Sequence, residues 1–370
     1  MAVDTGPDPH GRLADSPTEI PRRGWKDVLQ RVKAEAKDDH LSLLAAGAAF
    51  FGLLALVPAM VAVVSVYGLV ANPASIDRQV SSALGAAPKE VREMIREQLT
   101  SIASGPSGGA WAALVVGVLV ALWSASSGMS HLIEALNTAY DEEESRGFVK
   151  LRLTSLALTI GALLFVVFAV AVIAVLPAVF TRWNLGIAGR IGVEAARWVL
   201  LGVSMSVGLS VLYRVAPDRQ DPKWRWVSVG AVVATGLWLL SSVAFSIYTA
   251  NFGKYNETYG TLGAAVVIML WLMITAAAVL IGAELNCELE RQTLLDSTTG
   301  APRPIGQRGA FAADTVGGAP GAGHEPRADN VAPASRETPT AATKSGFQLT
   351  SFLSGAAAAV AAFVLLKRRR

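Results

Sequence analysis

The sequence predicts an all-α fold, a polytopic bundle of six core transmembrane helices, on three observations. The chain holds six uncharged apolar stretches, and most of them exceed the roughly 20 residues that cross a ~30 Å hydrocarbon core. Hydrophobic residues make up 52% of the chain and charged residues only 16%, with a mean hydropathy of +0.43. A lipid-exposed segment must satisfy its own backbone hydrogen bonds, so these stretches are expected to be helices.

Charged residues bound each apolar stretch in turn. The flanking pairs are Asp39 and Asp77, Glu97 and Glu134, Arg152 and Arg182, Arg197 and Arg214, Arg225 and Lys254, and Glu257 and Glu284. The fourth stretch is short, from Trp198 to Tyr213. It extends back through Ile191 if Glu194 and Arg197, three apart on one helix face, neutralise each other.

The predicted organisation has a basic segment at 1–40, a six-helix membrane domain at 41–290, a disordered linker at 291–346 and an Ala-rich apolar helix at 347–370 with a basic end. The linker is poor in large apolar residues, which predicts disorder. The terminal helix is expected to lie at the membrane interface, to span it, or to bind a partner. Residues 88–103 form a predicted outer amphipathic helix, which is a packed lid or a substrate gate.

The distribution of Lys and Arg predicts the orientation. With the N-terminus inside, the inner segments carry fourteen of these residues and the outer loops eight. Because positive charge near helix ends is retained in the cytoplasm, we expect both ends of the six-helix core to be cytoplasmic. The pI of 9.0 then reflects topology and anionic lipid headgroups, and no nucleic-acid partner is expected.

Catalytic motifs are missing from the sequence. The four histidines, His10, His40, His131 and His324, show no metal-binding spacing, and no phosphate-binding loop occurs. The lone Cys287 is expected to pack inside. The sequence therefore predicts no enzyme, no metal and no cofactor, and it makes nuclease activity very improbable.

Polar residues near the inner ends of the second and sixth stretches are the first set of candidate transport or binding residues. They are His131, Glu134, Asn137 and Tyr140, followed by Glu284 and Asn286. An ionisable group at membrane depth costs free energy, which favours a function for it. These groups line an inner vestibule, or they make ordinary hydrogen bonds between helix ends. Glu284 is the strongest candidate.

A second set of candidates lies before the sixth stretch, where Tyr255, Asn256 and Tyr259 belong to a short polar and aromatic hairpin. This hairpin contacts a ligand outside the cell, or it is an aromatic anchor that fixes the depth of the helices.

Several motifs between Trp25 and Glu290 point to a known family. They are Ala-Ala-Gly-Ala-Ala-Phe-Phe at 45–51, Leu-Trp-Ser-Ala-Ser-Ser-Gly at 122–128, Ala-Leu-Asn-Thr-Ala-Tyr at 135–140, Tyr-Arg-Val-Ala-Pro at 213–217, Trp-Arg-Trp at 224–226, Tyr-Asn-Glu-Thr-Tyr-Gly at 255–260 and Gly-Ala-Glu-Leu-Asn at 282–286. This stretch resembles the bacterial inner-membrane family called YihY, BrkB or, historically, ribonuclease BN. The resemblance implies six spans with both termini inside, in the plasma membrane.

Three functions are consistent with these sequence features. We favour a permease or lipid flippase-like transporter of an amphipathic envelope molecule. The alternatives are a non-transporting scaffold for envelope assembly and, least favoured, a membrane enzyme. The expected partners are membrane lipids, with envelope proteins and a second copy of the chain as further classes. A polar cavity lined by Glu284 and Glu134 would favour transport, and dry packing around them would favour the scaffold.

Overall fold

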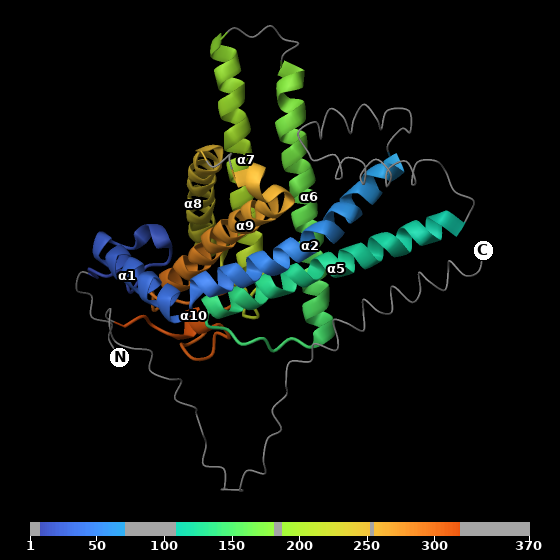
Figure 1. Cartoon of the computed structure of the whole chain (residues 1–370). Coiled ribbons are helices and arrows are strands. Elements are labelled where there is room, and N and C mark those ends of the chain that lie inside the picture. The colour runs from blue at the N-terminus through green and yellow to red at the C-terminus, as the bar shows by residue number, and fades with distance from the viewer. Residues whose placement is uncertain (1–7, 71–108, 181–186, 252–254, 319–370) are drawn as a thin grey trace. The chain divides into compact units, whose positions relative to one another are not determined.

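A computed structural model describes residues 8–70, 109–180, 187–251 and 255–318, and six of its helices are long and apolar enough to cross a membrane (Figure 1). These helices are α2 (Leu41–Val70), α5 (Gly109–Ala139), α6 (Phe148–Phe180), α7 (Ile187–Val215), α8 (Trp224–Asn251) and α9 (Tyr255–Glu290). The prediction of an all-α fold with six membrane-spanning helices is confirmed.

The helix of the fourth span, α7, continues through two charged residues, Glu194 and Arg197. The apolar part of α7 runs from Ile191 to Val215. Arg197 and Glu194 form an ion pair one turn apart, and the indole of Trp198 also donates to Glu194 over 3.0 Å. The charges satisfy each other on one helix face, as the spacing predicted, so the span is longer than its uncharged part.

Two residues in the left-handed backbone region end helices at sharp turns. His40 has φ 52° and separates α1 (Arg22–Asp38) from α2, while Asp141 has φ 55° and follows α5. The N–H of Glu142 donates to the carbonyl oxygen of Asn137 over 2.8 Å, which closes the C-terminus of α5. Asp and His tolerate this conformation better than most residues, so these turns need no glycine.

Helix α9 is the central element of the packing. It contacts α1, α2, α5 and α8, while α6 contacts α5 and α7, and α7 packs on α8. Figure 1 shows α9, in orange, lying between the blue α2 and the yellow-green α8. A residue on α9 can therefore reach groups from most of the other helices.

The buried core lies towards one end of these helices. Its members come from the first turns of α2 and α8 and from the last turns of α5, α7 and α9, for example Ala45, Ile133, Tyr213, Ala231 and Leu280. We call this the polar end, because it also holds α1, the loops at 140–147 and 216–223, and residues 291–318. Away from it the helices expose large apolar side chains, including Leu119, Leu164, Val203, Leu240 and Val266, as lipid contact requires.

Helices α8 and α9 approach each other closely at a pair of glycines. A Cβ on Gly230 would lie 2.1 Å from the carbonyl oxygen of Gly282 and 2.4 Å from Oδ1 of Asn286. A Cβ on Gly282 would lie 2.4 Å from the hydroxyl of Tyr213. Small residues at such crossings let backbones approach, and here they bring Asn286 against α8.

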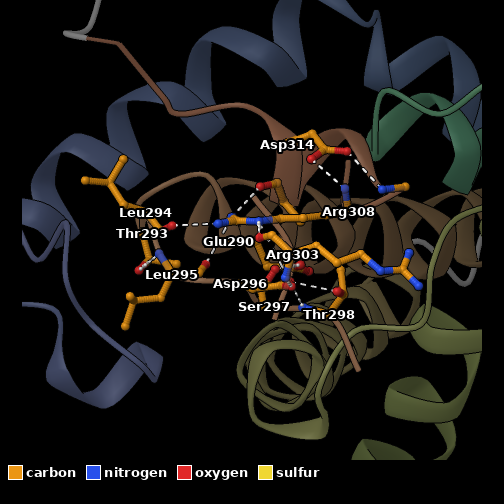
Figure 2. A network of polar contacts seen from close by, with 12 residues as sticks. Glu290, Thr293, Leu294, Leu295, Asp296, Ser297, Thr298, Arg303, Arg308 and Asp314 are labelled. Carbon is orange, nitrogen blue, oxygen red and sulfur yellow. Dashed lines mark hydrogen bonds and ion pairs between the residues drawn. The ribbon is translucent and has the colours of Figure 1, made fainter. Parts of the chain in front are cut away.

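Residues 291–318 are folded, whereas the sequence predicted a disordered linker from residue 291 onward. This segment, which we call the C-terminal clasp, folds onto the polar end and includes the short helix α10 (Phe311–Asp314). The guanidinium of Arg308 donates to the carbonyl oxygens of Leu294 and Ala313 over 2.8 and 2.7 Å (Figure 2). The carboxylate of Asp314 accepts the N–H groups of residues 306, 308 and 309. Polar side chains replace a large apolar core here, which composition could not reveal.

The clasp joins three other parts of the polar end. The N–H of Leu294 donates to the carbonyl oxygen of Arg12 over 2.7 Å. The N–H of Lys223 donates to the carbonyl oxygen of Ser297 over 2.8 Å. The N–H of Phe311 donates to Oε1 of Glu142 over 2.7 Å. The clasp therefore contacts the N-terminal segment and both loops of the polar end.

Three predictions fall on residues outside the described ranges. They are the outer amphipathic helix at 88–103, the part of the linker from 319 to 346, and the Ala-rich helix at 347–370.

Candidate functional site

Glu284 lies near the end of α9 and is 2% exposed. Its carboxyl group shares a hydrogen bond with Asp39, and Asp141 and Glu288 also lie close enough to act on its charge. The other carboxyl oxygen, Oε1, has no hydrogen-bond partner among the described residues. Two carboxyl groups can share a hydrogen bond only if one of them carries a proton. The arrangement can therefore hold a proton between α9 and the turn that joins α1 to α2.

Glu288, one helical turn further along α9, is fully buried between two arginines. Arg31 of α1 donates to one carboxylate oxygen of Glu288 and Arg291 donates to the other. Arg31 also donates to Oε1 of Gln292 over 2.8 Å, and Arg291 donates to Glu35 over 3.0 Å. Burial alone would lower the pKa of Arg291, but the charge of Glu288 raises it above its ordinary value. This network fixes α1 on α9.

A second buried ion pair joins Arg219, in the loop at 216–223, to Glu290. The distance from Nη2 of Arg219 to Oε2 of Glu290 is 2.6 Å, and both side chains are 0% exposed. Ser297 donates to the same oxygen over 2.7 Å. Burial alone would lower the pKa of Arg219, but the carboxylate of Glu290 raises it. The pair ties the α7–α8 loop to the end of α9.

Asn286 uses its whole amide group to join three segments. Its Oδ1 accepts the N–H of Gly230 over 2.7 Å, and its Nδ2 donates to the carbonyl oxygen of Val227 and to the hydroxyl of Tyr140, over 3.2 and 3.3 Å. Burial raises the pKa of Tyr140, so its hydroxyl stays neutral. Both residues lie at the polar end, where their hydrogen bonds serve helix packing.

Asn137 has a similar connecting role at the end of α5. Its Nδ2 donates to Oε2 of Glu144 over 2.9 Å, and its Oδ1 accepts the N–H of Asp218 over 2.9 Å. Asn137 thus joins the two loops of the polar end to each other.

His131 and Glu134 are not brought together with Glu284. The ring of His131 stacks on Phe51 with a centroid distance of 3.4 Å. Its Nδ1 lies 3.4 Å from Oε2 of Glu134, whose side chain is 78% exposed. Glu134 therefore lies on the outer surface of the helices, whereas Glu284 is buried.

The second set of candidates has a different backbone conformation from the predicted one. Tyr255, Asn256 and Tyr259 lie in the first turns of α9 and not in a hairpin loop, because α9 begins at Tyr255. Their side chains lie outside the described part of the structure.

Sequence reasoning missed the buried charges Arg31, Arg219, Glu288 and Glu290. One signal was available, since Glu284, Glu288 and Arg291 follow one another at i, i+4 and i+7 on one helix face. Arg31, which pairs with Glu288, comes from α1, and Arg219, which pairs with Glu290, comes from a loop. No spacing within α9 could have found them.

Glu142, in the loop that follows α5, is a titratable group in contact with the clasp. Burial raises the pKa of its carboxyl group to about 7, although the N–H of Phe311 that it accepts acts in the opposite direction. This carboxyl group therefore changes charge near neutral pH.

No group of three or more His, Cys, Asp or Glu side chains that could hold a metal ion occurs within the described ranges. The absence of metal, cofactor and enzymatic activity stays a prediction.

The fold and these residues define a multi-pass helical membrane protein whose helix ends are joined by buried ion pairs. Residues 32–304 match the family described as Virulence factor BrkB, and the chain belongs to that family. The match confirms the predicted resemblance and extends it into the clasp. No solved structure matches the chain.

Bacterial relatives agree with this assignment. The chain is 32% identical to the ribonuclease-like protein YfkH of Bacillus subtilis over 67% of this chain and 89% of the relative. It is 25% identical to a UPF0761 membrane protein of Photobacterium profundum over 74% of this chain and 84% of the relative. A UPF0761 membrane protein of Stenotrophomonas maltophilia is 27% identical over 68% of this chain and 58% of that protein.

Proposed function

We propose that the protein is a transporter that moves an amphipathic envelope molecule across the bacterial plasma membrane, with Glu284 as its proton-binding group. The observation that carries the proposal is the buried Glu284 carboxyl group, which shares a hydrogen bond with Asp39 and has one oxygen without a partner in the described part of the chain. Ionisable groups at this depth are expensive and commonly belong to ion or proton pathways. Protonation and release at this pair would change the contact between α9 and the α1–α2 turn.

The proposed orientation places the polar end in the cytoplasm. The basic loops of the sequence support it, because Lys and Arg near helix ends favour that side. Glu284 would then exchange protons with the cytoplasm, and the apolar helix surfaces would contact lipid tails.

Lipid translocation by the purified protein in liposomes tests the proposal. Labelled phospholipid and labelled isoprenoid-linked lipid would be followed for the wild type, Glu284→Gln and Glu134→Gln. We expect the wild type to translocate one of these lipids, Glu284→Gln to abolish the movement, and Glu134→Gln to retain it because Glu134 is exposed. Equal amounts of folded protein in the three preparations are required for the comparison.

If Glu284→Gln translocates lipid as fast as the wild type, Glu284 does not have the proposed role. A wild type that moves neither lipid, with or without a pH gradient, would overturn the transporter itself.

A scaffold for envelope assembly is the second candidate. The clasp favours it, and so does the exposed position of Glu134, which separates Glu134 from the buried Glu284. Buried ion pairs join α1 and the loop at 216–223 to α9, and hydrogen bonds join the clasp to both polar-end loops. Such a rigid surface suits a docking platform. Association with envelope proteins that survives Glu284→Gln, without any lipid movement, would support this candidate.

A further inference from the structure

Helix α1 has two faces of different chemistry. Gly24, Val28 and Arg31 lie on the face that is buried against the rest of the protein. The opposite face carries a shallow groove that is open to solvent and is lined by Arg22, Trp25, Lys26, Leu29, Gln30 and Lys33. These positions recur at helical spacing, so they form one stripe along the exposed side of the helix.

The groove combines an apolar floor with a basic rim. Leu29 is 55% exposed although it is a large apolar residue. Trp25 is held in place because its partly buried ring packs on the cluster that contains Val28 and Trp226. A fixed indole, an exposed leucine and flanking cations are the features of a helix that binds a membrane interface.

The charges of α1 are segregated between its two faces. Asp27 pairs with His10 over 2.5 Å, and Glu35 pairs with Arg291. These two acids are thereby directed away from the groove. The cations Arg22, Lys26 and Lys33 surround an almost wholly apolar surface, and none of the six lining residues is acidic. The groove is therefore complementary to an amphipathic anion.

The position of α1 in the chain favours a lipid as that anion. α1 ends at Asp38 and the spanning helix α2 begins at Leu41, so α1 is joined to a span by a turn of two residues. We propose that this groove binds an anionic phospholipid, with the phosphate region between the three cations and the adjoining acyl chain on Trp25 and Leu29. The site is separate from Glu284 and does not depend on the proposed transport.

Quenching of Trp25 by brominated lipids tests the site in the full-length protein. Proteoliposomes would contain brominated phosphatidylglycerol or brominated phosphatidylcholine, and the difference between the wild type and Trp25→Phe would isolate the signal of Trp25. We expect phosphatidylglycerol to quench Trp25 at a lower mole fraction than phosphatidylcholine, with a preference that weakens at high salt.

The charged rim is tested by the triple change Arg22→Gln, Lys26→Gln and Lys33→Gln. It should reduce the preference for phosphatidylglycerol at least about fivefold, because one basic residue near an anionic surface contributes about that factor. If the triple variant fails to fold, the single change Lys33→Gln provides the same comparison.

The matched control changes three exposed cations outside α1, Lys150→Gln, Arg225→Gln and Arg303→Gln, and should keep the preference. An equal loss in the control would mean that general charge, and not the groove, attracts the lipid. That result, or a wild type without preference at Trp25, would overturn the proposal.

Discussion

At the residue scale, the buried ion pair of Arg219 and Glu290 joins the α7–α8 loop to α9, and neither side chain reaches solvent. Removing one partner of a buried pair leaves an uncompensated charge, which costs about 3–5 kcal/mol. We expect Glu290→Ala to lower the free energy of unfolding by about that amount, measured by chemical denaturation in detergent.

An exposed ion pair supplies the control for Glu290→Ala. Asp15 and Arg225 pair over 2.7 Å, with side chains 52% and 39% exposed. Asp15→Ala should cost at most about 1 kcal/mol, because solvent screens the pair. Similar losses in the two variants would show that the buried pair is not a principal contact of the polar end.

Glu142 makes the contact between α5 and the clasp sensitive to pH. The pKa of its carboxyl group is about 7 in the folded protein, above the ordinary value of 4.5, so the docked clasp favours the protonated form. The stabilisation is complete below pH 4.5 and is lost as pH rises through about 7. We expect the Phe311 amide to exchange hydrogen faster at pH 8 than at pH 6, after correction for the intrinsic exchange rate.

The change Glu142→Gln tests the origin of this pH dependence. Glutamine keeps an oxygen that accepts the N–H of Phe311 but cannot change its charge. The corrected exchange rate should then be nearly equal at the two pH values. A pH dependence that persists in this variant would assign it to a group other than Glu142.

At the element scale, the crossing of α8 and α9 depends on Gly230. A Cβ at this position would overlap Gly282 and the amide of Asn286, because these atoms would lie 2.1 and 2.4 Å away. We expect Gly230→Ala to lower the free energy of unfolding by about 1–3 kcal/mol through overpacking. Thermal unfolding in detergent would measure this effect.

The same helix offers a control for Gly230→Ala. A Cβ on Gly236 would meet nothing within 4 Å, and alanine is the better helix former. Gly236→Ala should therefore be neutral or slightly stabilising. If both variants were neutral, α8 and α9 would not pack as closely as described.

At the whole-molecule scale, Gly317 brings the two ends of the described chain together. Its carbonyl oxygen accepts from Arg12 over 2.6 Å, and its N–H donates to the carbonyl oxygen of Arg291 over 2.9 Å. A Cβ on Gly317 would lie 2.5 Å from Cζ of Arg31. Arg31 cannot easily move aside, because Glu288 and Gln292 bind its guanidinium.

We therefore expect Gly317→Ala to loosen the clasp. Overpacking of about 1–3 kcal/mol would make the amide of residue 317 exchange hydrogen at least about fivefold faster. Gly147→Ala is the control, since a Cβ on Gly147 would meet nothing within 4 Å. Unchanged exchange in Gly317→Ala would contradict the described contact with Arg31.

The six spans, the all-α class and the family were predictable from the sequence, because helices in lipid are specified by local features, namely apolar length and flanking charge. It also singled out Glu284, a carboxylate at the end of an apolar run. The three-dimensional contacts were needed to show that Glu284 faces Asp39, that Glu134 faces outward and that Arg219 meets Glu290. These pairings join residues far apart in the chain, and composition and periodicity carry no information on such contacts. The clasp was missed for the same physical reason, since its order comes from hydrogen bonds to other segments and not from its own apolar residues.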